Sequence, residues 1–93
     1  MSKTIIPLGA QIALPLDTNS PIDGSNVNEA SLVYLCNTAA AGTNHLVSLS
    51  GDSGEFLGSF TLPGSTSITV KKKNLDRLAA SNAAVVATPI GWA

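Results

Sequence analysis

The chain has 93 residues, which is enough for one small domain. Charged residues make up 12% of the chain, against about 25% in a typical soluble domain, while apolar residues make up 44%. A net charge of −1 and an aromatic content of 4% argue against nucleic-acid binding, and a single cysteine excludes an intrachain disulfide and a thiolate metal site.

Residues 1–29 are predicted to form an extended arm ahead of a β-domain over residues 30–93. The arm holds three of the five prolines, which forbid a helix and weaken a central strand. Its apolar residues are too many for a free tail, so we expect them to contact a neighbouring subunit, with residues 11–16 able to pair along a sheet edge. The candidate contact residues are Ile5, Ile6, Leu8, Ile12, Leu14 and Leu16.

Three features bear on where the chain folds. There is no stretch of about 18 apolar residues, so we expect no membrane-spanning helix, and the proline-interrupted start predicts no signal peptide. Cys36 lies in an apolar run, which indicates a buried, inert thiol. Together these features predict folding in a reducing cytoplasm.

Two strands are predicted next along the chain. Residues 31–37 (SLVYLCN) carry apolar residues on both faces, which is typical of a central strand covered on both sides. Residues 44–50 (NHLVSLS) form the second strand, and residues 51–54 form the turn after it.

Residues 55–73 are predicted to form a hairpin in the middle of an antiparallel sheet. Both arms alternate with a period of two, which is the pattern of half-buried strands. Pro63 and Gly64 are a strong turn pair, because proline presets φ and glycine tolerates the positive φ that we expect at Gly64.

The last third of the chain is predicted to contain one helical turn and one strand. Asn74 can cap a turn of helix over residues 75–80, and residues 83–88 form the final strand. Short strands separated by turn residues predict an all-β fold, a small antiparallel β-sandwich or barrel with one short helical turn and an extended N-terminal arm.

No pattern of residues predicts catalysis, a cofactor or a metal site. Residues 51–54 (GDSG) are similar to the nucleophile motif of chymotrypsin-like proteases, but Glu55 replaces a needed glycine and His45 lies on the same predicted hairpin. Residues 17–24 hint at a calcium loop, but a proline occupies a ligand position. We therefore predict a chain without enzyme activity.

Basic residues gather in one region. Four of the five are Lys71, Lys72, Lys73 and Arg77. They can be a solvated strand end that blunts a sheet edge, the cationic half of protein–protein ion pairs, or a phosphate contact. We include them with the arm as candidate contact residues.

Short segments from Ser31 onward carry a family resemblance over roughly two thirds of the chain. They are Leu35-Cys36-Asn37-Thr38, Asn44-His45-Leu46-Val47, Gly58-Ser59-Phe60-Thr61-Leu62-Pro63-Gly64, Val70-Lys71-Lys72, Asp76-Arg77-Leu78-Ala79-Ala80 and Ala87-Thr88-Pro89. In these segments the chain resembles small all-β virion structural proteins of tailed bacteriophages, especially those of marine and cyanobacterial hosts. The family pattern has Thr before the Asp, where this chain has Leu75.

The resemblance, together with the low charge and the apolar arm, implies a non-enzymatic virion subunit made in the host cytoplasm. We expect a capsid cement or decoration protein that binds the major capsid protein or other virion proteins, as a homo-oligomer or as part of a large assembly. A neck or tail component is the alternative within this class. From other classes, a small ligand- or glycan-binding β-module would need exposed aromatic residues, and an enzyme would need a nucleophile–base pair or a metal cluster. We expect no cofactor, nucleic acid or membrane partner.

Overall fold

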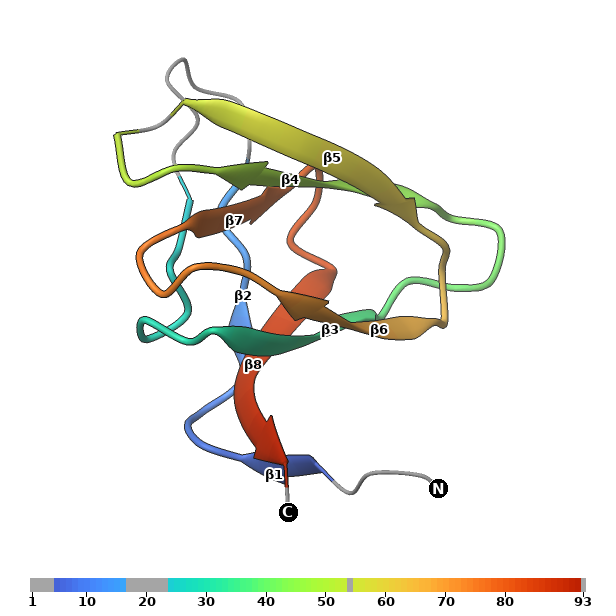
Figure 1. The fold of residues 1–93 in the computed structure, drawn as a ribbon. Helices are drawn as coiled ribbons and strands as arrows, with labels where there is room; N and C mark the ends of the chain where they lie inside the picture. The colour runs from blue at the N-terminus through green and yellow to red at the C-terminus, as the bar shows by residue number, and fades with distance from the viewer. Residues whose placement is uncertain (1–4, 17–23, 54, 93) are drawn as a thin grey trace.

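The computed structural model describes residues 5–16, 24–53 and 55–92. These residues form eight β-strands, and no helix is found among them (Figure 1). The strands are β1 Ile5–Pro7, β2 Ile12–Ala13, β3 Leu32–Asn37, β4 His45–Ser50, β5 Phe56–Leu62, β6 Ser67–Lys71, β7 Arg77–Ala80 and β8 Val85–Trp92. The predicted all-β class is confirmed.

The strands form two antiparallel sheets that enclose one core. The larger sheet has the order β1-β8-β3-β6, with β2 also paired to β8, and the smaller sheet has the order β5-β4-β7. Both sheets and the segments before β3 contribute buried side chains to the core: Leu14, Val27, Val33, Leu35, Val47, Leu62, Leu78, Ala80, Val85 and Ala87. Two layers around one core confirm the predicted small β-sandwich.

The strand β3 shows how the sequence pattern becomes a sheet. It lies between β8 and β6, as a central strand should. Val33 and Leu35 are fully buried on the core side, while Tyr34 and Cys36 alternate with them and are half-buried on the other side. The prediction that both faces are covered is therefore wrong, and so is the prediction of a buried thiol, because the second layer covers only one face.

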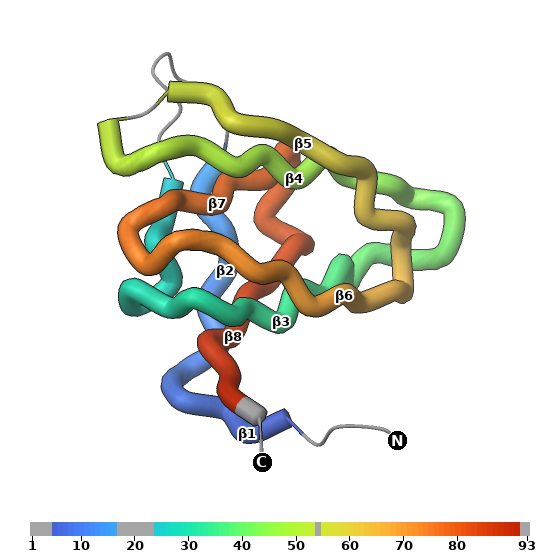
Figure 2. The backbone as a smooth tube through the Cα atoms, viewed as in Figure 1, coloured from blue at the N-terminus to red at the C-terminus, as the bar shows by residue number. Residues whose placement is uncertain are grey.

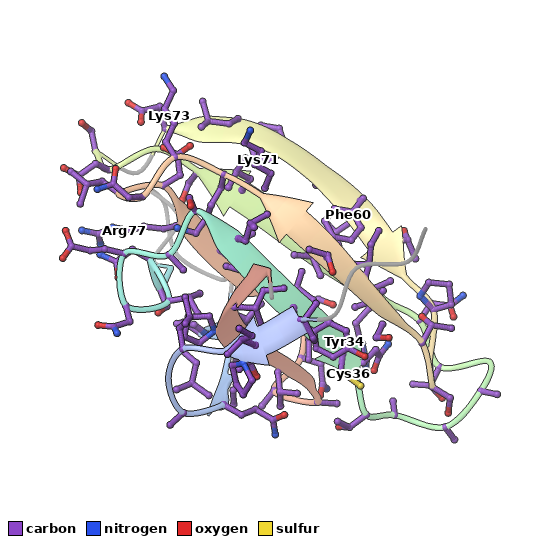
Figure 3. The ribbon with its side chains drawn as sticks, turned by 60° about the horizontal axis from the view of Figure 1, so that its bottom comes forward. Tyr34, Cys36, Phe60, Lys71, Lys73 and Arg77 are labelled. Carbon is purple, nitrogen blue, oxygen red and sulfur yellow. The ribbon has the colours of Figure 1, made fainter. Side chains whose placement is uncertain are left out.

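The strands β5 and β6 do not pair with each other, so the hairpin predicted over residues 55–73 is wrong. β5 pairs with β4 at one edge of the smaller sheet, and β6 pairs with β3 at one edge of the larger sheet. Phe60 of β5 packs against the core and lies between the two edge strands (Figure 3). The residues that join β5 to β6 therefore carry the chain from one layer to the other.

Gly64, in the connection between β5 and β6, is needed for close packing and not for a positive φ. The positive φ lies at Ser65, with a value of 59°, and not at Gly64 as predicted. Gly64 is buried, and a Cβ atom there would collide with the carbonyl oxygen of Ala40. Glycine is needed because the β3–β4 loop approaches the backbone closely, and not because of a left-handed conformation.

The side chain of Asn37 fixes the same region from the other sheet. This residue ends β3 and is fully buried. Its Nδ2 atom donates to the carbonyl oxygens of Thr43 at 3.1 Å and Leu62 at 2.8 Å, while its Oδ1 atom accepts from the amide of Ala39 at 3.0 Å. One amide group thus bonds main-chain groups from the β3–β4 loop and from the end of β5.

The helical turn predicted over residues 75–80 is absent. The amide of Asp76 donates to the carbonyl oxygen of Lys73 at 3.0 Å, which closes a tight turn around Asn74 and Leu75. β7 follows at once and pairs with β4, and its last three residues are buried. Pairing within the sheet outweighs the helical preference of leucine and alanine.

A left-handed turn precedes β3. Val27, Asn28 and Glu29 have φ values of 52°, 57° and 56°, a conformation that is unfavourable for residues other than glycine. The Ser25 hydroxyl accepts from the amide of Val27, and the Asn26 side chain accepts from the amide of Glu29. These bonds and the burial of Val27 in the core hold the turn in place.

Candidate interaction surface

The first part of the predicted arm, β1 and β2, lies along β8 of its own chain (Figure 2), whereas Ser25, further along the arm, forms a bridge with Leu78 of β7. β1 pairs with the end of β8, where Pro7 is opposite Ile90, and β2 pairs further back, where Ile12 is opposite Ala87. The step from Pro7 to Ile12 is five residues, whereas the step between their partners is three. The arm therefore bulges by two residues between β1 and β2, around Gly9, and resumes the same edge.

The arm continues from the larger sheet to the smaller one. After β2, the amide of Leu14 donates to the carbonyl oxygen of Val85 at 3.0 Å. The amide of Ala80, at the end of β7, donates to the carbonyl oxygen of Pro15 at 2.9 Å, and Leu16 forms a parallel bridge with Ala80. This path connects both layers of the sandwich, so the arm is held by main-chain bonds at several points.

The six apolar candidates on the arm divide into one core residue and five surface residues. Leu14 is only 2% exposed and belongs to the hydrophobic core. The other five have exposed fractions between 37% and 62%, with Leu8 the most exposed. These five residues are Ile5, Ile6, Leu8, Ile12 and Leu16, and we refer to them as the arm surface.

The basic residues do not form a single cationic surface. Lys72 is buried, and its Nζ atom donates to the carbonyl oxygens of Lys73 at 3.2 Å and Asn74 at 3.3 Å. Arg77 forms an ion pair with Asp52, with 3.4 Å between Nη2 and Oδ1. Lys71 and Lys73 are exposed on β6 and on the turn after it (Figure 3).

Burial also changes the titration of Lys72. It lowers the pKa of the ammonium group, because the charged form loses hydration, and the nearby Asp76 carboxylate partly opposes the shift. The two carbonyl oxygens that accept from Nζ take the place of part of the lost water. Lys72 therefore serves the turn between β6 and β7, and only its two lysine neighbours are available for contacts.

The protease-like motif and His45 have structural roles in turns and strands and form no catalytic or metal site among the described residues. The residues of the protease-like motif that the structure describes, 51–53, form a turn closed by a bond from the amide of Gly51 to the carbonyl oxygen of Glu55 at 2.9 Å. His45 is half-buried opposite Leu62. Among the described residues there is no pocket, and no group of three histidine, cysteine or acidic residues could hold a metal ion. Residues 17–23 of the calcium-like loop lie outside the described residues.

A second apolar surface was not predicted from the sequence. Phe56 and Leu57, at the start of β5, are 60% and 52% exposed, and Leu46 on the neighbouring β4 is 41% exposed. The alternating pattern of β5 suggested a strand in mid-sheet, whereas its true place is an edge. The signal that was present is the uncharged stretch from Phe56 to Leu62, which contains neither the lysine nor the proline common on protected edges.

Comparisons with known proteins add no relative to this picture. No protein-family model matches the chain, and no curated protein or solved structure is significantly similar to it. No helix in the described ranges has the length and apolar character needed to cross a membrane.

Proposed function

We propose that the chain is a non-enzymatic structural subunit of a phage particle, specifically a capsid cement or decoration protein. The observation that carries the proposal is the arm surface, where five apolar side chains are exposed on a segment that is bonded into the fold. Ile6 and Leu8 are two residues apart and lie on the same side of the arm, and neighbouring exposed apolar side chains are typical of sites that another protein covers. The sequence resemblance of residues 31–89 to small virion proteins is the reason for proposing a phage particle as the assembly.

The arm surface suits a permanent contact with a shell. Because the arm is already ordered along β8, binding needs little further loss of backbone entropy. β1 and β2 pair with β8 on one side only, so their other side can accept a strand of the capsid protein through main-chain bonds. A low content of charged residues also lowers the cost of removing the surface from water.

Counting the chain in purified particles tests the proposal. We expect quantitative mass spectrometry to find it in an amount comparable to the major capsid protein, and we expect particles that lack it to lose their DNA at a lower temperature. A copy number far below that of the capsid protein would favour the alternative, a neck or tail component. Absence of the chain from particles would overturn the proposal.

A further inference from the structure

The free edge of β5 is the least protected edge among the residues that the structure describes. β5 has seven residues and pairs with β4 alone, so its outer side carries unpaired main-chain donors and acceptors. No charged residue or proline lies between Phe56 and Leu62. By contrast, the edge strand β6 ends in Lys71 and is followed by two more lysines, and β1 contains Pro7.

The exposed apolar residues near this edge lie at opposite ends of it. Phe56 and Leu57 are at the start of β5, while Leu46 lies beside Thr61, near the end of β5, because these two residues are register partners in β4 and β5. An antiparallel partner strand of the same sequence would bring the start of one β5 to the end of the other. A strand whose start is complementary to its own end suits a twofold interface, in which residue i of one subunit contacts residue j of the other and the reverse.

We propose that β5 pairs antiparallel with β5 of a second copy of this chain, across a twofold axis at Ser59. The two three-stranded sheets then become one continuous six-stranded sheet. Only β5 and its neighbour β4 form this interface, so it does not depend on a role in a phage particle.

This register places compatible side chains together. With Ser59 opposite Ser59 of the second copy, Leu57 is opposite Thr61 of the second copy, and Leu46 of that copy is next in the row. Ser59 and Thr61 share one face of the strand, and Leu46 shares it through its pairing with Thr61, while Leu57 lies at an irregularity in the β4–β5 pairing, between Phe56 and Gly58. Each dimer therefore contains two such rows, in which the exposed side chains of Leu57 and Leu46 approach each other across the interface.

The charges also permit this pairing. Glu55, the acidic residue just before β5, would be opposite Pro63 of the second copy, so no like charges face each other along the strand. The β6 edge, by contrast, ends in Lys71 and is followed by Lys73, and exposed lysines at an edge strand oppose pairing with another strand. The uncharged β5 edge is therefore the one that fits an identical partner.

Introducing a charged residue at Ser59, on the twofold axis, tests the interface. Ser59 is exposed, so Ser59→Lys and Ser59→Glu should both fold, which circular dichroism can verify. In a dimer each variant places two like charges directly opposite, and we expect the dimer dissociation constant to rise about tenfold or more in low salt. An equimolar mixture of the two variants should restore association, because lysine then faces glutamate. Gln11→Lys adds the same charge on the exposed arm and should leave the dimer unchanged.

Analytical ultracentrifugation of the full chain gives the readout. We expect the wild-type chain to sediment as a dimer, Ser59→Lys and Ser59→Glu to shift toward the monomer, and their mixture to return to the dimer. A wild-type chain that stays monomeric at about 100 µM, a concentration at which even weak dimers form, would overturn the proposal. So would a trimer, or a Ser59→Lys variant that dimerises as well as wild type.

Discussion

Three buried polar or small residues hold the ends of the strands in place. Asn37 donates to the main chain of Thr43 and Leu62 and so connects the two layers at the end of β3. Gly64 lets the connection from β5 approach the carbonyl group of Ala40. At the other end, Lys72 donates to two carbonyl oxygens in the turn before β7. At Gly64 there is no room for a larger side chain. Asn37 and Lys72 are buried, so water cannot easily replace the hydrogen bonds that they make.

Close packing at Gly64 predicts a specific cost of adding one methyl group. Gly64→Ala should lower the free energy of unfolding by about 1–3 kcal/mol, because the new Cβ collides with main-chain atoms that cannot move away easily. Gly58→Ala is the matched control, since a Cβ there has no heavy atom within 4 Å and alanine is preferred to glycine in a strand. Urea unfolding of both variants measures the difference. Equal stability of the two would contradict the close approach.

Burial of Lys72 predicts a pH dependence in the alkaline range. Below the lowered pKa of the folded state, Lys72 is charged in both states and the cost of its burial is present in full. As the pH rises from that pKa toward the ordinary value of 10.5, the folded chain releases the proton more readily than the unfolded chain, and the cost is relieved. The free energy of unfolding of wild type should therefore rise relative to that of Lys72→Met over this range. A difference that stays flat with pH would mean that Lys72 is hydrated in the folded protein.

At the scale of the strands, the sequence located most elements but not their partners. The period of two placed β4, β5 and β6 close to their observed positions, because alternation follows from burial of one face, and a short apolar run placed β3. The same pattern does not say which strand pairs with which. A turn of two residues and a connection between two sheets look alike in sequence when both contain proline and glycine. The two arms of the hairpin predicted over residues 55–73 are therefore edge strands of different sheets.

The β7 strand shows a different limit. Its four residues, RLAA, favour helix locally and were predicted as such. Their strand conformation comes from bonds to β4, whose residues lie about 30 positions earlier, so local preference carried no information about it. Small side chains fit there because the strand is buried and flanked by β4 and by the segments at Leu16 and Ser25.

The arm is an element whose stability and surface can be separated by mutation. Leu14→Ala should cost about 2–5 kcal/mol of unfolding free energy, because the side chain is buried in the core. Leu8→Ala, six residues earlier, should cost about 0.5 kcal/mol or less, because most of the Leu8 side chain is in water. Chemical unfolding followed by circular dichroism measures both. Similar costs at the two positions would mean that the arm does not lie along β8 as described.

At the scale of the whole molecule, the sandwich uses few charges and leaves two apolar surfaces. The sequence identified the arm as apolar and as a candidate contact segment. Five of its six candidate residues are exposed, whereas Leu14 is buried in the core. The basic cluster separated into a buried lysine, an ion-paired arginine and two exposed lysines, since the direction of each side chain depends on the turn after β6. The β5 edge was missed because its exposure depends on which strands pair.

Retention of arm variants on particles tests the central claim, that the arm surface joins this chain to a phage shell. The double variant Ile6→Ser, Leu8→Ser changes two exposed side chains, and Leu75→Ser is the control, because Leu75 is 42% exposed on the turn between β6 and β7. Each apolar side chain buried in the contact contributes about 1–2 kcal/mol, so co-sedimentation with particles that lack the chain should weaken about tenfold or more in the double variant. The control should bind as wild type does. Unchanged retention of a folded double variant would contradict the claim.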